Sequence, residues 1–259
     1  MELLNRHIPQ EYLALKINYC RQQLELLPKV TVQTHKVRGV PTQRLVVGGH
    51  RFKPDSNSGE QSVQIMKRRS YLERELQIYE AIWEAKYKDE PFPECEPHKV
   101  IRKMFIDTGK QVTLNKEYFD SLKNDADTKH PKPLDFKFDG IYYRSAAERE
   151  IAMFYTEMGI PFKYEPEVMI RGLNGFIYPD FVPYFEEIDN CKIHEHFGMK
   201  NSSNYLRITG VKYSNYTNAG LVPELDILFT HDVEGMPFDI RYLSSKLNAA
   251  IYGTVISTK

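Results

Sequence analysis

The chain has 259 residues, of which 41% are hydrophobic and 27% charged, and a net charge of zero, a composition typical of a globular protein that can bury a sizeable core. No run of about eighteen apolar residues occurs, and the N-terminus lacks an apolar segment followed by a cleavage site, so the sequence does not support membrane insertion or secretion. Three widely spaced cysteines without a CxxC pair predict reduced thiols in a cytoplasmic protein rather than a disulfide framework or a zinc ribbon.

Charge is unevenly distributed along the chain although the total is zero. Residues 1–144 contain 25 Lys and Arg against 20 Asp and Glu, whereas residues 145–259 contain 10 against 15. A basic half is suited to gripping a polyanion. Carboxylates that repel one another stay together only when a cation neutralises them, so an acidic half is suited to a metal site.

The first predicted elements form a helical arm. Residues 10–27 are predicted to be a helix, because apolar residues recur at alternating spacings of four and three and a proline follows. Residues 30–37 and 43–47 are predicted to be two strands, and residues 61–87 one long helix packed antiparallel to the first. Prolines in residues 89–97 indicate a linker, so we predict an arm of residues 1–97 and a second domain of residues 98–259.

The predicted hairpin of the arm is strongly basic. Residues 29–53 contain six Lys and Arg but no Asp or Glu, and three more basic residues lie near the start of the long helix. A ribbon with this bias can lie along a phosphate backbone. The alternative is a solvated hairpin whose charges prevent its edges from pairing with other strands. The candidate nucleic-acid contacts are Lys36, Arg38, Arg44, Arg51, Lys53, Lys67, Arg68 and Arg69.

The C-terminal part is predicted to alternate helices and strands. Residues 100–122 are expected to be helical or mixed, and Asp139-Gly140 is the signal of a tight hairpin. The later elements are a helix at 146–158, strands at 162–170, 176–184 and 191–197, a helix at 205–216, a strand at 225–230 and a helix opened by Pro237. This order predicts an α/β (α+β) fold in which helices cover both sides of an open mixed sheet.

Three carboxylates lie at defined places in this pattern. Glu148 opens the first helix in Arg-Ser-Ala-Ala-Glu, Asp180 lies in Tyr-Pro-Asp-Phe, and Glu195 lies in His-Glu-His-Phe-Gly. The arrangement resembles the PD-(D/E)XK nuclease superfamily, whose restriction-endonuclease-like αβββαβ core would correspond to about residues 134–259. The whole chain is also similar to a group of uncharacterised bacterial proteins that share these motifs, Glu-His-Phe-Gly-Met and Lys-x-x-x-Tyr.

The lysine of the superfamily motif is missing from its usual position. Residues i and i+2 of a strand face the same side, so the lysine of Glu-x-Lys normally faces the metal with the glutamate, but Phe197 stands there. Lys212 and Tyr216 lie one turn apart on the following helix, where branches of the superfamily place a relocated lysine and a tyrosine. Lys163, on the first strand, is the other candidate.

The resemblance implies metal-dependent hydrolysis of a phosphodiester, with DNA a better expectation than RNA as the substrate. Asp180 and Glu195 would hold Mg²⁺ or Mn²⁺, because such ions prefer oxygen ligands and retain several waters. Lys212 would orient the attacking water or add positive charge, Tyr216 would fix Lys212 or contact the substrate, and Glu148 would bind metal through water or orient a second ion. A homodimer through the arm is compatible with the sequence.

Plainer explanations remain for each of these residues. Ser145-x-x-Glu148 is also a capping box, and Asp180 can be an exposed acid after an edge-strand proline. Since Phe197 replaces the lysine, the fold can also persist as a degenerate nucleic-acid-binding or complex-assembly module. A third alternative is a zinc site, because His194 and His196 share one face of a strand, with His231 or Asp232 as a further ligand.

Overall fold

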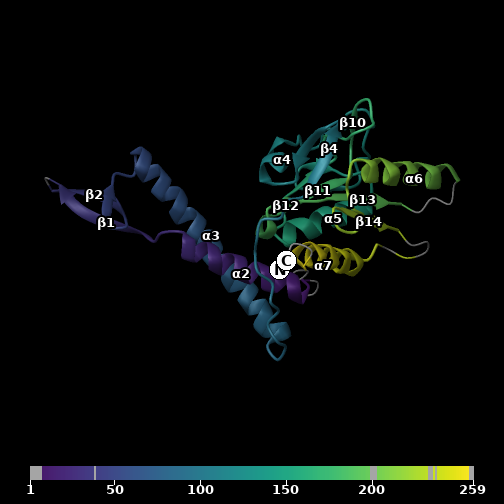
Figure 1. Ribbon diagram of the computed structural model, residues 1–259. Helices are drawn as coiled ribbons and strands as arrows, with labels where there is room; N and C mark the ends of the chain where they lie inside the picture. Colours follow the sequence, from purple (N-terminus) through teal and green to yellow (C-terminus); the bar gives the residue numbers. More distant parts are fainter. Residues whose placement is uncertain (1–7, 38, 199–202, 233–235, 237, 257–259) are drawn as a thin grey trace. The chain divides into compact units, whose positions relative to one another are not determined.

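The computed structural model describes residues 8–37, 39–198, 203–232, 236 and 238–256 (Figure 1). The chain forms two compact units, one comprising residues 98–259 together with the N-terminal segment through Tyr12, and the other comprising Leu13–Pro97. Residues 8–12, which the sequence analysis assigned to the arm, belong to the C-terminal unit. The reason is packing: the Tyr12 ring meets the Phe185 ring edge-on at 6.2 Å, and the Asn248 amide donates to the Glu11 carboxylate at 3.0 Å.

The unit formed by Leu13–Pro97 is a helical arm that carries a small antiparallel sheet. Its hairpin strands pair along their full length, from Val30 opposite Val47 to Val37 opposite Val40. The long helix begins four residues earlier than predicted, because the Ser56 hydroxyl accepts the Gly59 amide as an N-cap. The elements are α2 (Gln10–Leu26), β1 (Val30–Val37), β2 (Val40–Val47), β3 (His50–Phe52) and α3 (Asn57–Tyr87).

Arginine side chains join the two helices of the arm. The Arg69 guanidinium donates to the carbonyl oxygens of Leu24 and Leu27 at 2.7 and 2.6 Å, which satisfies carbonyl groups left without partners where α2 ends. Arg68 donates to the Tyr19 hydroxyl at 3.2 Å. Both arginines were candidate nucleic-acid contacts from sequence, and the structure gives them contacts that stabilise the arm.

The C-terminal unit contains a five-stranded mixed sheet. Strand β11 pairs antiparallel with β8 on one side and with β12 and β13 on the other, and β13 pairs in parallel with β14. Along the chain the order is α5, β8, β11, β12, β13, α6, β14, α7, which is a mixed α/β fold. These elements are α5 (Ala146–Glu157), β8 (Phe162–Tyr164), β11 (Phe181–Phe185), β12 (Asn190–Cys191), β13 (Ile193–Phe197), α6 (Ser203–Asn218), β14 (Ile227–His231) and α7 (Ile240–Ile256).

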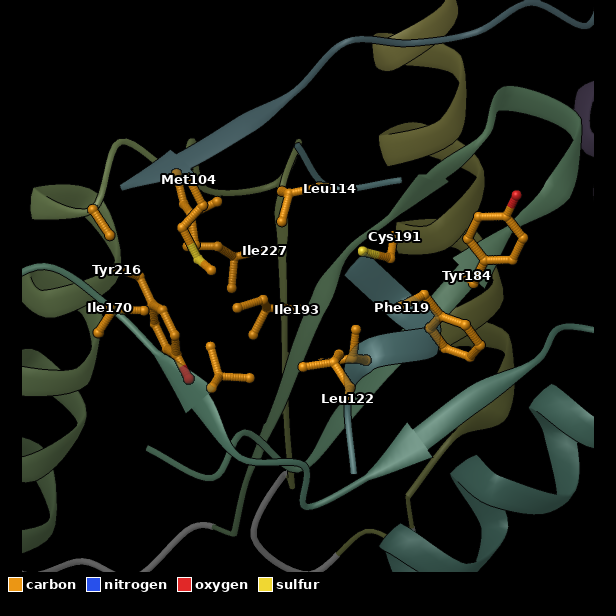
Figure 2. Close-up of a cluster of buried hydrophobic side chains, with 14 residues drawn as sticks. Met104, Leu114, Phe119, Leu122, Ile170, Tyr184, Cys191, Ile193, Tyr216 and Ile227 are labelled. Carbon is orange, nitrogen blue, oxygen red and sulfur yellow. The ribbon is translucent and has the colours of Figure 1, made fainter. Parts of the chain in front are cut away.

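Both faces of this sheet are covered. On one face the Tyr155 ring of α5 contacts Phe181 and His194, and Thr254 of α7 accepts a hydrogen bond from Lys192. On the other face, Figure 2 shows a cluster of buried apolar side chains that continues onto α4 (Lys116–Ser121), α6 and the hairpin β4–β5 (Lys103–Asp107, Lys110–Thr113). The predicted arrangement of helices on both sides is therefore confirmed.

Two predicted long strands are interrupted. The first ends at Tyr164 because Glu165 has φ +40°, a left-handed conformation that breaks the ladder, and pairing resumes only in β9 (Val168–Met169). The second is split by Pro179, which lies between β10 (Phe176–Ile177) and β11. Consequently β9 and β10 form a separate hairpin, and Asp180 immediately precedes β11.

The segment before α5 contains more β structure than expected. Residues 100–122 form the β4–β5 hairpin and the short helix α4. The Asp139-Gly140 hairpin is confirmed as β6 (Lys137–Phe138) and β7 (Ile141–Tyr142), with φ values of +46° and +81° at the two turn residues, as a type I′ turn requires. Across the described ranges, no helix combines the length and apolar character needed to cross a membrane.

The fold contains a buried carboxylate, Asp226, that is paired with an arginine. Asp226 is 1% exposed and accepts two hydrogen bonds from the Arg102 guanidinium, at 2.8 and 2.5 Å, and one from the Val222 amide. We predict that Arg102→Ala lowers the free energy of unfolding by about 3–5 kcal/mol, because it leaves a buried carboxylate uncompensated. Urea denaturation measures this change. In contrast, Arg241→Ala, which breaks the exposed pair with Asp239, should cost less than about 1 kcal/mol, and equal losses would contradict the assignment.

Candidate active site

Strand register brings Asp180 and Glu195 together. Phe181 of β11 lies opposite His194 of β13 in an antiparallel pair, so the next step of the same register places Asp180 opposite Glu195. Residues directly opposite each other in such a pair project to the same face, with their Cβ atoms about 5 Å apart. The two acids therefore lie on one side of the sheet and are close enough to share an ion.

The register also places a third acid beside them. On the other side of β11, Phe181 lies opposite Tyr164, and the Glu165 amide donates to the Asp180 carbonyl at 3.0 Å. The backbones of Glu165, Asp180 and Glu195 thus lie next to one another at the ends of neighbouring strands, and we call these residues the row of acids; Glu165 has a left-handed backbone, so its side chain does not follow the strand alternation. The outer two members of the row have side-chain cations as partners, whereas Asp180 in the middle accepts a backbone hydrogen bond from His196 at 2.6 Å.

Asp180 is a carboxylate in an unfavourable electrostatic position. Burial raises its pKa well above the usual value, and the charges of Glu195 and Glu148 raise it further. The Lys212 ammonium and the His196 amide act in the opposite direction but do not cancel these effects. Because the ionised form is disfavoured in this position, a further cation at Asp180 would be strongly stabilising.

Glu195 is held by two residues of α6. Its Oε2 atom accepts the Lys212 ammonium at 2.7 Å, and its Oε1 atom accepts the Tyr216 hydroxyl. Glu195 is 1% exposed, whereas the Lys212 side chain is 36% exposed and reaches the acid from the surface. Burial and the Glu195 charge raise the pKa of Tyr216 well above its usual value, so this hydroxyl remains a proton donor. The sequence-predicted pair of residues on α6 therefore meets the sequence-predicted acid.

The other lysine candidate points elsewhere. The Lys163 ammonium lies 5.2 Å from the centre of the Phe119 ring. Phe197, which occupies the expected lysine position, stacks on Phe229 with ring centres 5.6 Å apart. Phe229 is in turn the parallel-strand neighbour of Glu195. An aromatic stack therefore stands where the family resemblance places an ammonium, and Lys212 is the lysine that reaches Glu195.

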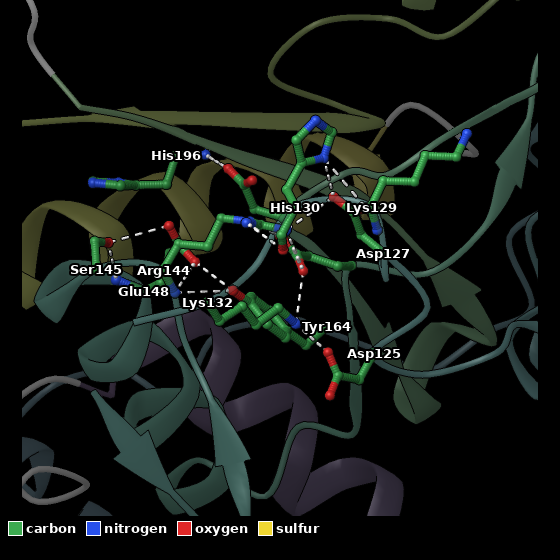
Figure 3. A network of polar contacts seen from close by, with 12 residues as sticks. Asp125, Asp127, Lys129, His130, Lys132, Arg144, Ser145, Glu148, Tyr164 and His196 are labelled. Atoms are coloured by element: carbon green, nitrogen blue, oxygen red, sulfur yellow. Dashed lines mark hydrogen bonds and ion pairs between the residues drawn. The ribbon is translucent and has the colours of Figure 1, made fainter. Parts of the chain in front are cut away.

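Glu148 is engaged in holding the start of α5, as Figure 3 shows. The Ser145 hydroxyl accepts the Glu148 amide at 3.1 Å as the N-cap. The Glu148 carboxylate reaches back to the Ser145 hydroxyl and the Arg144 amide, each at 3.2 Å, and accepts the Tyr164 hydroxyl at 2.7 Å. Burial raises the pKa of Glu148. The serine half of the capping box is thus present, whereas the Glu148 carboxylate accepts the Arg144 amide instead of the Ser145 amide, and the charge of Glu148 also acts on Asp180.

A network of ion pairs borders the acids, and the sequence analysis did not predict it (Figure 3). The Arg144 guanidinium grips both oxygens of Glu165 and donates to Asp127 at 2.9 Å. The Lys132 ammonium lies 2.7 Å from Glu165 and 4.3 Å from the centre of the Tyr164 ring. The position of Arg144 directly before the Ser-x-x-Glu cap was a usable signal, but its partners come from a loop and a strand that no local pattern connects.

The strand histidines form a hydrogen-bonded chain. His194 contacts the Tyr155 hydroxyl through Nδ1 and the Thr230 hydroxyl through Nε2, both at 2.8 Å. His196 contacts the same Thr230 hydroxyl through Nδ1 at 2.9 Å and Asp232 through Nε2 at 3.2 Å. All four ring nitrogens therefore have protein partners, as in a hydrogen-bonded structural role.

The donor set suits a hard divalent cation held by few protein ligands. Within the described ranges, no group of three or more His, Cys, Asp or Glu residues is arranged to hold a metal ion. The structure therefore does not bring Glu148 into one ligand group with Asp180 and Glu195. Mg²⁺ is commonly bound by one or two carboxylates, with waters and substrate phosphates as the other ligands, and Asp180 and Glu195 fit that pattern.

The basic residues predicted to contact nucleic acid are distributed over the arm. Lys36, Arg51, Lys53 and Lys67 are exposed, Arg44 is half-buried, and Arg38 lies outside the described residues.

Comparisons with protein-family models, with curated proteins and with solved structures found no match. Function is therefore inferred from the geometry and chemistry of the site.

The raised pKa of Asp180 has a testable effect on stability. A carboxyl whose pKa is higher in the folded than in the unfolded protein loses stabilising free energy as pH rises through the folded pKa. We predict that Asp180→Asn has a higher melting temperature than the wild type at pH 7 to 8, and that the difference shrinks towards pH 4. Thermal melts across this range measure the effect. The exposed Asp120→Asn control should show no stabilisation, and a destabilised Asp180→Asn at neutral pH would contradict the electrostatic account.

Proposed function

We propose that the C-terminal unit is a metal-dependent nuclease that hydrolyses phosphodiester bonds in nucleic acid, with DNA rather than RNA as the substrate. The observation that carries this proposal is the pair of register-matched acids, Asp180 and Glu195, with the Lys212 ammonium beside them. The order α5, β8, β11, β13, α6, β14 and the motifs that resemble the PD-(D/E)XK superfamily also support it. The preference for DNA rests on analogy with that superfamily.

Asp180 and Glu195 would hold Mg²⁺ or Mn²⁺. The acids repel each other, and one ammonium does not compensate both charges together with that of Glu148. Such an ion, when bound, lowers the pKa of a coordinated water and neutralises charge that develops on a phosphate. The acid pair is therefore suited to bringing a phosphodiester and a water together.

Lys212 would act on the reacting phosphate or on the attacking water. Its ammonium contacts Glu195 from the surface, and its partial exposure lets it exchange the carboxylate for a phosphate oxygen without crossing the core. A positioned ammonium stabilises negative charge in the transition state more than water does, because it needs no reorganisation. Tyr216 would keep the Glu195 carboxylate in one orientation while Lys212 moves.

Glu148 and its partners would position the site from the edge of the sheet. Tyr164 precedes Glu165, and Arg144 joins Glu165 to the start of α5 through its guanidinium and backbone amide. These contacts hold the end of β8 in place. The position of Asp180 depends on this strand, because β8 pairs with β11. We therefore assign Arg144 and Tyr164 a positioning role and reserve direct contact with the metal for Asp180 and Glu195.

A second candidate function is a nucleic-acid-binding or complex-assembly module without catalysis. The specific observation in its favour is that both Glu195 oxygens already accept hydrogen bonds from α6. An ion pair of this kind can be purely structural, and the missing lysine at Phe197 fits the same explanation. The two candidate functions predict different results when Asp180 is substituted. Only the nuclease would lose a measurable cleavage of nucleic acid.

The direct test is incubation of the full chain with supercoiled, linear and single-stranded DNA and with RNA, in Mg²⁺, Mn²⁺ or EDTA. We expect cleavage of DNA that requires the metal and falls by on the order of 10²-fold or more in Asp180→Asn. Cleavage that survives Asp180→Asn would remove this residue from the mechanism. Metal-independent binding of DNA without cleavage, unaffected by Asp180→Asn and Glu195→Gln, would favour the non-catalytic module.

Variants of α6 test the role of the relocated lysine. We predict that Lys212→Ala lowers kcat by about 10²–10³-fold, because it removes a preorganised positive charge, whereas Lys212→Arg retains part of the activity. Tyr216→Phe, which deletes the hydroxyl donor to Glu195, should have a smaller effect. The matched control is Lys246→Ala, which breaks a lysine–glutamate pair of similar length with Glu224 elsewhere on the unit. Equal rates for Lys212→Ala and the control would exclude Lys212 from catalysis.

A further inference from the structure

The C-terminal unit has a hollow beside the outer edge of β8. The hollow holds about 500 Å³, which lies within the range of small-molecule pockets in proteins. Its walls come from β8, the end of α5, α4, the β6–β7 hairpin and the loop that contains Asn124. Its aromatic and charged members are Phe119, Phe138, Tyr143, Phe162, Asp139 and Lys163. The hollow is therefore distinct from the row of acids.

Strand β8 turns its outer side towards this hollow. Its inner side pairs with β11, and no residue of β11 lines the hollow. Backbone groups of an antiparallel strand point alternately to its two sides. The Pro161 carbonyl and the Glu165 amide bond inwards, to backbone groups of residues 180–184. By alternation, the amide and carbonyl groups of Phe162 and Tyr164 point outwards.

Within the described part of the chain, the open stretch of this edge is one residue long. The Tyr164 amide donates to the Asn124 side chain, and the Tyr164 carbonyl accepts the Asp125 amide, both at 2.7 Å. Pro161, on the other side, has no amide proton. By contrast, the outward amide and carbonyl of Phe162 have no hydrogen-bond partner among the residues that the structure describes. One donor and one acceptor are too few for a further strand, which needs a row of them, but they suit the edge of a single planar heterocycle.

A lysine without an acidic partner borders the hollow. The Lys163 ammonium lies 5.2 Å from the centre of the Phe119 ring, and no carboxylate of the described ranges forms an ion pair with it. The nearby Lys132, in contrast, is paired with Glu165. An ammonium that rests on an aromatic ring without a counter-charge is available to an anion.

Lys163 also lies on the sheet face that carries the candidate metal ligands. It is opposite Val182 of β11, and Val182 and Asp180 are two residues apart, so all three project to one face. With a rise of about 3.3 Å per residue and about 4.8 Å between strands, the Cα atoms of Lys163 and Asp180 are about 8 Å apart. That separation is short enough for adjacent phosphates of one nucleic-acid strand to reach Lys163 and an ion held by Asp180.

We infer that the hollow binds one unpaired base of a DNA strand, with the Phe162 backbone at the edge of the base and the Lys163 ammonium on its phosphate. Proteins hold bases that have left a stack by aromatic side chains and by hydrogen bonds to the base edge. Asp139, exposed at the rim, accepts amino protons of a base but repels a phosphate, which favours the phosphate on the Lys163 side.

This inference rests on the proposed function and deepens it, because it specifies the form of the substrate. A base reaches the hollow only when it is not paired or stacked in a duplex. The strand that passes Asp180 is therefore single-stranded or locally unpaired beside the bond that is cleaved.

The test compares two single-stranded DNA oligonucleotides of equal length, one with all its bases and one abasic, by fluorescence anisotropy in EDTA so that cleavage does not interfere. We expect the full wild-type chain to bind the base-containing strand about tenfold more tightly, since stacking of one base on aromatic side chains contributes on that scale. Thr156→Trp fills the hollow from an exposed position of α5, so it should remove this preference and leave binding of the abasic strand unchanged. The matched control, Glu150→Trp, adds the same side chain at an exposed position of α5 outside the hollow and should keep the preference.

Substitution of Lys163 tests the phosphate contact. Lys163→Ala should weaken the binding of both strands and reduce the slope of log affinity against log salt by about 0.7, the value for one phosphate of a single strand. Lys163→Arg should restore the slope. Lys110→Ala, which removes an exposed lysine of β5, is the control, with less than a twofold effect expected. A wild-type salt slope in Lys163→Ala would remove the phosphate contact.

The outcomes separate this inference from the proposed function. If Thr156→Trp keeps the base preference, or if the wild type shows no such preference or binds neither strand, the base site is wrong, and a peptide is left as the occupant of the open edge. Those results would leave any Asp180-dependent cleavage standing. If the preference follows the Thr156 variant but no cleavage occurs in Mg²⁺ or Mn²⁺, the nuclease proposal fails and the base site stands. Circular dichroism of each variant verifies that the unit remains folded.

Discussion

The site depends on the antiparallel register between β11 and β13. That register places Asp180 opposite Glu195 and, through β8, places Glu165 on the other flank of Asp180. A slip of one residue would turn one acid of the pair to the opposite face, among the aromatic rings around Tyr155 and His194. The polar contacts at the ends of these strands, including the His196 amide on Asp180, therefore fix the geometry of the candidate site as well as the sheet.

The electrostatic balance of the row explains why its middle member is the candidate metal ligand. Glu165 is compensated by Arg144 and Lys132, and Glu195 is paired with Lys212. Asp180 is buried near the charges of Glu195 and Glu148, so its ionised form is costly in the folded protein. Retaining such a group lowers stability, which is the usual trade-off at sites that act on charged substrates.

Local patterns in the sequence predicted helices, strands and the three candidate carboxylates. Contacts between segments far apart in the chain could not be predicted from such patterns. The spacing on α6 placed Lys212 and Tyr216 one turn apart, the family resemblance suggested their role, and in the structure both contact Glu195; Asp139-Gly140 was enough to predict a hairpin. Strand lengths were overestimated because composition does not reveal a left-handed Glu165 or the break at Pro179. The Arg144 network and the capping of α2 by Arg69 join residues far apart in the chain, beyond the reach of periodicity.

The central claim is that Asp180 and Glu195 share one divalent cation. The most direct measurement is anomalous diffraction from crystals soaked in Mn²⁺, compared between the wild type and Asp180→Asn. The account predicts a manganese peak within coordination distance of both carboxylates in the wild type, with the Lys212 ammonium displaced from Glu195, and no peak in the variant. A peak elsewhere, or none between the two acids while Lys212 remains on Glu195, would contradict it.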